Sequence, residues 1–326
     1  MKHVARLWAF AGLALAIVLF AREDVGSSVA LVLAAGPGLV LASLFHALPM
    51  IANGRAWQRL LPEWQRPTLH LISWATWLRE SINGLLPVAR VGGEIVAYRI
   101  VRSHVADRAE AAASLVADMA LSVLSQAGFA LLGIALLLAM GHTTTLTSHL
   151  LAGVGVMIAL GAGFVLVARA GALGALTGTF NRLFAGQLGR GQRSALQFEQ
   201  ALRNIYKRHI DVGTCLVWQL AGWVLGAGEI WLALWFLGQG SNALDAVVIE
   251  ALVQGVSSAA FVVPGALGVQ EGAFVLIGAA VGIDSVTALA LATARRLRDV
   301  IIFFPGLLAW QWTEARMRRL KSGGVS

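Results

Sequence analysis

The stretch RESINGLLPVARVGGEIVAYR, residues 79–99, interrupts an apolar region with a proline and two adjacent glycines. A second stretch, FVVPGALGVQEGAF, residues 261–274, interrupts another apolar region in a similar way. Proline removes a backbone donor and ends the helix before it, and glycine lets the chain turn tightly. We therefore expect the regions 68–102 and 244–283 each to contain two helices separated by a break.

The composition around these breaks is that of a membrane protein. The 326 residues are 58% hydrophobic and 13% charged, whereas a soluble domain carries about 25% charged residues. The single cysteine, Cys215, excludes an intrachain disulfide and a CxxC site, and no HxxxH or HExxH motif occurs. We expect no metal, no cofactor and no catalytic residue. The net charge of +8 lies mainly in connections and at the chain ends, which argues against nucleic acid as a partner.

Charge asymmetry between the connections orients the chain. A helical span needs about 20 mostly apolar residues, and basic residues collect in the connections 53–67 and 169–208 and in the tail 314–326. The connections 141–149 and 238–242 have no Lys or Arg. By the positive-inside rule both termini and all basic connections are cytoplasmic. The expected full spans, about six, are 7–21, 28–52, 111–140, 150–168, 209–238 and 286–313.

The two interrupted regions cannot each be one full crossing without reversing this charge pattern. The simplest solution is a pair of re-entrant broken-helix hairpins, one from each side of the membrane, with the breaks buried in protein or lining a wet cavity. Two full crossings in each region is the alternative. The first reading gives an all-α integral membrane protein that forms one transmembrane domain, residues 1–326.

A single offset of 177 relates the two regions. It places Pro87 on Pro264, Glu94 on Glu271, and Asp107 on Asp284. Because the matched segments are expected to enter from opposite sides, we predict an inverted repeat, with repeat 1 at about 1–140 and repeat 2 at about 150–313. Inverted repeats with broken helices are typical of secondary transporters, whose ligand sites lie near the membrane midplane.

Charged residues within apolar segments mark the candidate site, because ionisable residues inside a membrane are costly and often functional. Glu94 and Glu271 open the arms after the breaks, where helix capping is an equally good explanation. Arg295, Arg298 and Asp299 form a charged stripe on the last span. Asp118 and Arg295 occupy equivalent positions, and a direct salt bridge between them would be a simple pairing. The structural alternative is that these charges only lock the bundle together.

NGLLPVARVGGE, residues 83–94, followed by VVPGALGVQEG, residues 262–272, resembles the lysylphosphatidylglycerol-synthase transmembrane region, also called the flippase-like domain. The first motif is most similar to the hopanoid-associated subfamily. The resemblance covers nearly the whole chain and implies a lipid translocase, or the membrane part of a lipid-modifying enzyme. Lysyl-transferring members carry a soluble catalytic domain after the membrane region, whereas this sequence ends at Ser326, so we expect no aminoacyl transfer. The family positions carried over are Asn83, Pro87, Gly92, Gly93, Glu94, Pro264, Gly265, Gly268 and Glu271.

The leading hypothesis is therefore a flippase or lipid-binding carrier in the bacterial cytoplasmic (inner) membrane. Its ligand would be a polar or anionic lipid, polyprenyl-linked or hopanoid-related, since the arginine guanidinium suits phosphate. The alternatives are an integral-membrane enzyme, or an accessory subunit that assists a partner enzyme of lipid, polyprenyl or hopanoid modification, and a structural membrane scaffold. The predicted lipid-binding residues are Asn83, Pro87, Arg90, Gly92, Gly93, Glu94, Arg99, Asp118, Glu250, Pro264, Gly265, Gly268, Gln270, Glu271, Arg295, Arg298 and Asp299.

Overall fold

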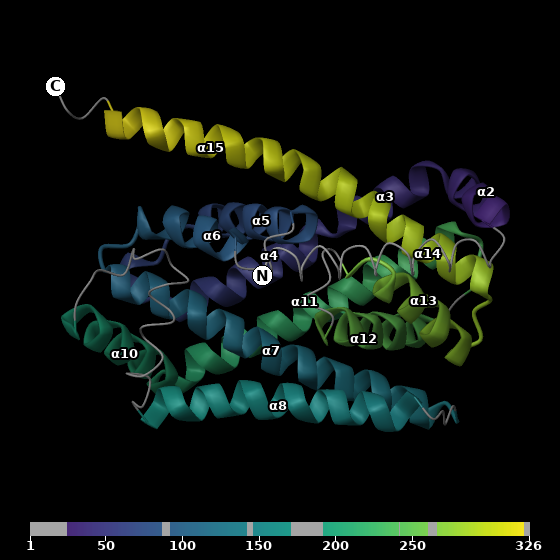
Figure 1. The fold of residues 1–326 in the computed structure, drawn as a ribbon, viewed down its shortest axis with the longest axis horizontal. Helices are drawn as coiled ribbons and strands as arrows, with labels where there is room; N and C mark the ends of the chain where they lie inside the picture. The colour runs from purple at the N-terminus through teal and green to yellow at the C-terminus, as the bar shows by residue number, and fades with distance from the viewer. Residues whose placement is uncertain are drawn as a thin grey trace, which may run out of the picture.

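Long apolar helices form the body of the protein (Figure 1). The computed structural model describes residues 25–86, 92–141, 146–170, 192–240, 242–259 and 266–322, and this part of the chain contains no strand. Within it, four helices are long and apolar enough to cross a membrane: Pro37–Leu60, Arg108–Ala139, Leu151–Ala168 and His209–Phe236. The predicted helices at 111–140, 150–168 and 209–238 are thus confirmed. The predicted span 7–21 lies outside the described residues.

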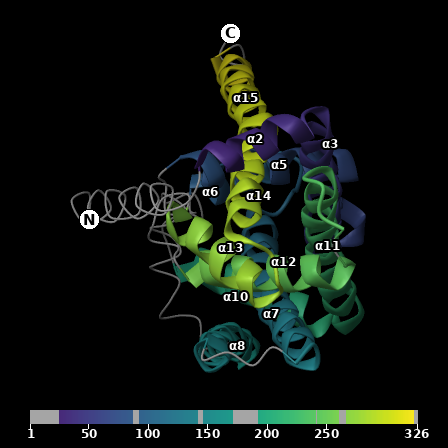
Figure 2. The same cartoon turned by 90° about the vertical axis from the view of Figure 1, so that its right-hand side faces the viewer.

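Helix α7 (Arg108–Ala139) packs against several other helices. Its neighbours are α8 (Leu146–Ala170), α10 (Gln192–Lys207), α11 (His209–Phe236) and α12 (Ala243–Ala259). Helix α8 lies on the outside of α7 in both views (Figures 1 and 2). Only 17% of its apolar stretch Leu151–Ala168 is buried. The exposed apolar surface of α8 is therefore suited to contact with lipid tails.

The predicted span at 28–52 has different bounds in the structure: a break at Gly36 separates α2 (Val25–Ala35) from the stretch Pro37–Leu60, which is long and apolar enough to cross a membrane. The chain forms three helices here, namely α2, α3 (Pro37–Phe45) and α4 (Ala47–Leu60). Gly36 has a φ of 47°, a backbone conformation that favours glycine, and Pro37 then starts α3. A second break at His46 separates α3 from α4. Both α3 and α4 pack against α11.

Both interrupted regions form a pair of helices, as predicted. The first pair is α5 (Leu69–Leu85) and α6 (Gly92–Arg102), after a short 3-10 turn at Glu63–Gln65, and the second is α12 and α13 (Val269–Ala280). The two members of each pair pack against each other. Figure 1 shows α5 and α6 toward one end of the long helices α7 and α8, and α12 and α13 toward the other end.

Helix boundaries recur at the spacing of 177 residues. Helices α6 and α13 begin at Gly92 and Val269, and α7 and α14 (Ser285–Arg298) begin at Arg108 and Ser285. The residues before α7 and α14 are Asp107 and Asp284, and both act as N-caps. Asp107 accepts a hydrogen bond from the Ala109 amide at 2.7 Å, and Asp284 accepts one from the Thr287 amide at 3.0 Å.

The predicted span 286–313 is a continuous helical stretch with a defect in its middle. Helix α14 is followed by a π-helical segment, η4 (Asp299–Phe303), and then by α15 (Phe304–Ser322). Pro305 has no N–H to donate to the carbonyl of Ile301 four residues earlier, which explains the departure from α-helical pairing. The indole N–H of Trp77 donates to the Ile302 carbonyl at 2.8 Å. This stretch is not among the four candidate spans, and charged residues interrupt it at 295–299.

The close approach of α15 to α5 depends on Gly306. A Cβ at Gly306 would collide with the side chain of Ser81, so the two helices could not pack as they do if this residue were larger. Gly84 of α5 lies in the same way against the ring of Phe303. Small residues at both positions bring the π-helical segment against α5.

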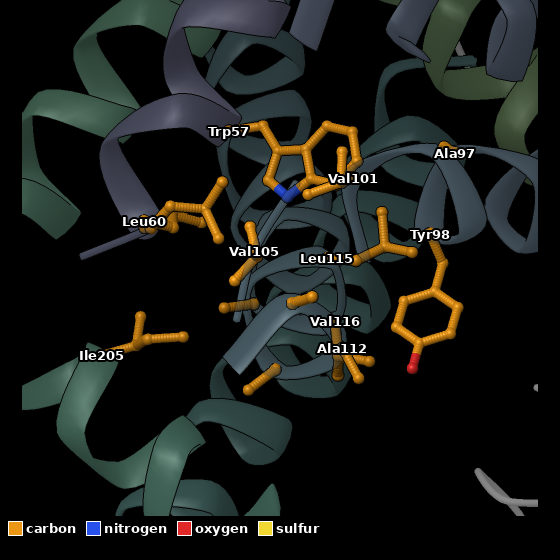
Figure 3. Close-up of a cluster of buried hydrophobic side chains, with 14 of the residues drawn as sticks. Trp57, Leu60, Ala97, Tyr98, Val101, Val105, Ala112, Leu115, Val116 and Ile205 are labelled. Atoms are coloured by element: carbon orange, nitrogen blue, oxygen red, sulfur yellow. The ribbon is translucent and has the colours of Figure 1, made fainter. Parts of the chain in front are cut away.

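The largest hydrophobic cluster joins α4, α5, α6, α7 and α10. Trp57 is a fully buried member of this cluster, and its indole N–H donates to the Ser114 hydroxyl at 3.2 Å. Figure 3 shows Trp57 with Leu60, Val101, Val105 and other side chains of this cluster. The cluster fixes α6 against α7, and so fixes the position of the first turn of α6, where Glu94 lies.

The N-caps at the start of α7 and α14 predict a matched pair of stability effects. Asp107→Ala and Asp284→Ala should each lower the free energy of unfolding by about 0.5–2 kcal/mol, because each leaves amides at the helix start without a partner. Asp107→Asn and Asp284→Asn should stay close to wild type, since asparagine caps equally well. Thermal unfolding in detergent measures both effects, and equal losses for alanine and asparagine would contradict the capping role.

Candidate functional site

Arg79 of α5 holds together the first buried cluster of charges. Its Nη1 lies 2.8 Å from Oδ2 of Asp118 on α7 and 3.7 Å from Oε2 of Glu94 on α6. All three side chains are nearly buried. One guanidinium thus serves two carboxylates from two other helices, which links the arm after the first break to the long helix α7.

Hydrogen bonds from neighbouring helices fix this cluster. Gln219 of α11 donates to Oδ1 of Asp118 at 3.1 Å and to the backbone carbonyl of Asp118 at 3.2 Å. The guanidinium of Arg79 lies over the ring of Trp57, with 5.6 Å to its centroid. A cation placed over an indole face is attracted by the ring quadrupole. Trp57 therefore stabilises the Arg79 guanidinium, which pairs with both carboxylates.

Asn83 near the end of α5 forms hydrogen bonds with the first turn of α6. Its Nδ2 donates to Oε1 of Glu94 at 3.3 Å, and its Oδ1 accepts a hydrogen bond from the Gly93 amide at 2.9 Å. A Cβ on Gly93 would collide with the backbone carbonyl of Arg79 and with the Asn83 side chain. Gly93 therefore allows the start of α6 to lie directly on α5, as its sequence position predicts.

The second cluster is centred on the arginines of α14. Arg295 forms an ion pair with Glu250 of α12, and their side chains are 1% and 2% exposed. The Arg295 guanidinium also lies 5.7 Å from the ring centroid of Phe274 on α13. Gln254 donates to Oε1 of Glu250 at 3.2 Å. Glu250 can approach α11 because Gly226 faces it there: a Cβ at Gly226 would lie 3.2 Å from Oε1 of Glu250.

Glu271 combines two roles at the start of α13. Its Oε2 accepts a hydrogen bond from the Gly268 amide at 2.7 Å, so it caps the helix as one of the two sequence explanations expects. Its Oε1 lies 2.8 Å from Nη2 of Arg296 on α14. Gly268 has a φ of 75°, which favours glycine at this turn. Capping and charge pairing therefore coexist in one carboxylate, beside the buried Gln270.

A third group of charges joins α5 and the α3–α4 junction to α11 and α14. His46 Nδ1 lies 2.7 Å from Oε2 of Glu229, and His46 Nε2 lies 3.9 Å from Oε2 of Glu80. Arg298 Nη1 is 3.5 Å from Oε2 of Glu229, and Arg298 Nη2 is 2.5 Å from Oδ1 of Asp299. The rings of His46 and Phe303 meet edge to face at 5.8 Å.

A small pocket lies between the second and third groups. Glu229, Arg295 and Ser43 provide its polar walls, and the rest of its lining is apolar. Its volume of ≈ 10 Å³ is about that needed for one water molecule. A lipid headgroup does not fit a space of this size, so binding one at this position would require the surrounding helices to separate.

The structure brings many of the predicted residues together. Asn83, Gly93, Glu94 and Asp118 meet in the first cluster, beside Gly92 at the start of α6. Pro87, Arg90, Pro264 and Gly265 lie outside the described residues. The predicted residues of the second region lie in or beside the charged groups of α12, α13 and α14; they are Glu250, Gly268, Gln270, Glu271, Arg295, Arg298 and Asp299.

Two expectations differ from the structure. The direct salt bridge between Asp118 and Arg295 is not formed, because Asp118 pairs with Arg79 and Arg295 pairs with Glu250. Arg99 lies apart from the buried charges. Its side chain is 41% exposed and its Nη1 is 3.4 Å from Oε1 of Glu314 on α15.

The predicted set lacks several residues of the buried charge groups. Arg79, Glu80 and Glu229 stand in apolar sequence, and that signal could have placed them in the set. Arg296 lies between Arg295 and Arg298 in the charged stripe of the last span, and the same signal applies to it. His46 and Gln219 carry no local signal, since only the packing of distant helices brings them to Glu229 and Asp118.

The shared guanidinium predicts a strong stability effect. Arg79→Gln should lower the free energy of unfolding by about 3–5 kcal/mol, because Glu94 and Asp118 would stay buried without a cation. Adding Glu94→Gln and Asp118→Asn should recover part of that loss by removing the uncompensated charge. Arg99→Gln is the matched control, and the loss of its exposed pair should cost about 0–1 kcal/mol. Unfolding of Arg79→Gln at the wild-type midpoint in detergent would refute the pairing.

The tight contact at Gly93 predicts a local defect. Gly93→Ala should destabilise the α5–α6 pair, because the new methyl group meets the Arg79 carbonyl and the Asn83 amide. A loss of about 1–3 kcal/mol is typical of overpacking. Gly128→Ala is the control, since a Cβ there has nothing within 4 Å. Amide hydrogen exchange should show loss of protection at the start of α6 in Gly93→Ala but not in Gly128→Ala, and unchanged protection in both would contradict the prediction.

Comparison with known proteins gives one family. The family model described as the lysylphosphatidylglycerol synthase TM region matches residues 6–306. No curated protein and no solved structure matches the chain. The matched range contains the two breaks and all three groups of buried charges. The chain belongs to the lysylphosphatidylglycerol synthase TM region family.

Proposed function

We propose that this protein moves a polar or anionic lipid between the two leaflets of the cytoplasmic membrane, or binds such a lipid as a carrier. The family is a membrane domain linked to lipid-related function. The observation that carries the proposal is the pair of buried charge clusters, one at each helix break. Ionisable side chains within apolar segments are expensive and are usually kept for function.

An inverted repeat would explain why the two clusters occur at corresponding positions. Helices α6 and α13, and likewise α7 and α14, begin 177 residues apart, and the two helix pairs lie toward opposite ends of the long helices (Figure 1). We infer two re-entrant hairpins that enter from opposite sides, about six full spans, and both termini in the cytoplasm. Ligand sites in such folds lie where the broken helices meet.

The arginines in these clusters suit a phosphate-bearing headgroup. A guanidinium presents a planar fork of donors that binds a carboxylate or a phosphate in the same way. Because Arg79 and Arg295 are already buried against carboxylates, a phosphate could replace a carboxylate without a new desolvation cost for the cation. The acyl, polyprenyl or hopanoid part would remain in the lipid that surrounds the bundle. A hopanoid-related ligand is the proposal drawn from the similarity of the first motif.

The pocket between Glu229 and Arg295 is small. This favours a site that opens and closes during transport rather than a site that is permanently open. In the arrangement described, no space of headgroup size is present at this position, so the headgroup would enter only when helices separate. Alternating access requires a site that is closed in at least one state. An enzyme would need a site open to one compartment, and a scaffold would need no opening at all.

Lipid movement in proteoliposomes tests the proposal. Wild type should accelerate the exchange of fluorescent lipids between leaflets, with a panel that covers anionic, zwitterionic and polyprenyl-phosphate lipids. Glu94→Gln and Glu271→Gln should each lower the rate by about tenfold or more if each carboxylate makes a buried charged interaction of about 1.4 kcal/mol or more.

The control for this assay is Arg99→Gln, whose exposed pair with Glu314 lies away from the clusters. It should move lipid at the wild-type rate. Folded Glu94→Gln and Glu271→Gln proteins that transport normally would indicate a structural role for the clusters. A wild type that moves no lipid of the panel would favour the membrane enzyme or an accessory subunit with a partner enzyme.

A further inference from the structure

Three arginines from separate parts of the chain meet one carboxylate beside the end of α4. Asp211, in the first turn of α11, has its Oδ1 3.1 Å from Nη2 of Arg59 and 3.8 Å from Nη2 of Arg66. Its Oδ2 accepts a hydrogen bond from Nη1 of Arg208 at 3.1 Å. Arg59 lies in the last turn of α4, Arg66 in the connection to α5, and Arg208 directly before α11. We call Arg59, Arg66 and Arg208 the arginine cluster.

Backbone carbonyls at the end of α4 hold two of these guanidiniums in place. Nη2 of Arg66 donates to the Leu61 carbonyl at 3.2 Å, and Arg208 donates to the carbonyls of Leu60 and Leu61. A cation at a helix C-terminus is favourable, because the last carbonyls have no partner within the helix. Capping thus fixes the positions of two arginines, but carbonyl groups supply no full negative charge to balance them.

The arginine cluster carries more positive charge than the carboxylates paired with it can balance. Three guanidiniums and Asp211 give a formal charge of +2, and Glu63, which is 80% exposed and 3.5 Å from Arg66, lowers it to +1. Glu110 of α7 forms no ion pair with the three arginines and accepts a hydrogen bond from Gln65. Burial, and then the charges of the other two arginines, lower the pKa of Arg66. That is the direction expected where like charges lie close together.

The cluster lies at the level where three long apolar helices end. The candidate span Pro37–Leu60 ends beside it, and His209–Phe236 begins beside it. Gln65, in the connection from α4 to α5, accepts a hydrogen bond from the Ala106 amide at 2.8 Å, so the span Arg108–Ala139 also begins here. For a chain embedded in a membrane, this is the level of the interface with water, where the phosphate groups of lipids lie.

Exposed apolar side chains neighbour the cluster in sequence. Trp64, two residues before Arg66, is 77% exposed, and Ile210, next to Asp211, is 82% exposed. Tryptophan is enriched at the membrane interface, where its ring contacts apolar and polar groups together. A partly exposed group of cations with exposed apolar neighbours matches the chemistry of a lipid, which presents a charged headgroup beside hydrocarbon.

We propose that the arginine cluster binds the phosphate group of an anionic membrane lipid at the surface of the bilayer. The guanidinium presents a fork of donors that suits phosphate oxygens, and the phosphate supplies the negative charge that the cluster lacks. The acyl chains would lie in the bilayer on the side of Trp64 and Ile210. This lipid is held at the surface, apart from the buried charges at the helix breaks. Its binding requires no lipid movement, so the inference stands or falls independently of the proposed function.

Native mass spectrometry of the purified protein in detergent measures the binding. Wild type should bind phosphatidylglycerol about tenfold more tightly than phosphatidylcholine, because the zwitterionic headgroup already carries its own cation. Arg59→Gln and Arg66→Gln should each reduce this preference to about threefold or less. Arg99→Gln is the matched control, since it removes one arginine from an exposed pair elsewhere and should keep the wild-type preference. The same preference in all four proteins would overturn the proposal.

Thermal unfolding separates lipid binding from a purely structural role of the cluster. In nonionic detergent without lipid, Arg59→Gln should unfold at or above the wild-type temperature, because one repelling cation is lost while Asp211 keeps Arg66 and Arg208. Phosphatidylglycerol should then raise the unfolding temperature of wild type more than that of Arg59→Gln, since a ligand stabilises the folded state that binds it. An equal loss of stability in Arg59→Gln with and without the lipid would leave the cluster a structural role only.

Amide hydrogen exchange in nanodiscs locates the bound lipid. Replacing part of the phosphatidylcholine by phosphatidylglycerol should slow exchange within residues 61–68 and 208–213 of wild type, and not of Arg59→Gln with Arg66→Gln. Slowing confined to the first turns of α6 and α13 would place the lipid at the buried charges and overturn the proposal. Reversal of the slowing by millimolar inorganic phosphate, but not by sodium chloride of equal ionic strength, would make this a site for a soluble anion and overturn the assignment to a lipid.

Discussion

The cost of burying a charge in an apolar bundle is the constraint on which the interior of this protein depends. Arg79, Arg295 and Arg298 are each paired with carboxylates from other helices. Removing one partner of such a pair leaves a charge that neither lipid nor protein can solvate. The positions of α5, α6, α7, α11, α12 and α14 relative to one another are therefore fixed by charge pairing as much as by hydrophobic packing.

The two halves are alike in their helix boundaries and unlike in their charge pairing. In the first half the arginine lies on α5, before the break, and serves Glu94 and Asp118. In the second half the arginines lie on α14, after the break, and serve Glu250 and Glu271. At equivalent positions Asp118 is acidic and Arg295 is basic. Helix starts that recur at one spacing thus carry different charge pairings, so the surroundings of the two breaks differ in charge.

Much of the fold could be predicted from sequence, because proline, glycine and N-cap residues act locally. The proline- and glycine-containing breaks placed Glu94 and Glu271 in the first turns of new helices, as α6 and α13 show, and the long apolar runs indicated α7, α8 and α11. The break before α3 was missed although Gly36 and Pro37 stand in the sequence, since the apolar run across them suggested one span. The partners of the charges could not be predicted in the same way. Asp118 and Arg295 are matched in register, yet each finds a nearer partner in its own half.

Histidine 46 shows the limit of sequence reasoning most clearly. It lies among apolar residues near a predicted span end, and nothing within several residues indicates a charged partner. Glu229 is 183 residues away and reaches it only because α3 and α4 both pack against α11. A contact of that kind depends on the tertiary packing of helices, and no local pattern contains it.

The π-helical segment at Asp299–Phe303 sets the rotational register of everything that follows it. Such a segment corresponds to one residue more than an α-helix of the same rise, and each α-helical residue turns the chain by about 100°. Shortening this segment by one residue would rotate α15 by about that angle, and Gly306 would no longer face Ser81. Insertions and deletions should thus be tolerated far less between residues 299 and 303 than point substitutions, because a change of length there turns an entire helix face away from α5.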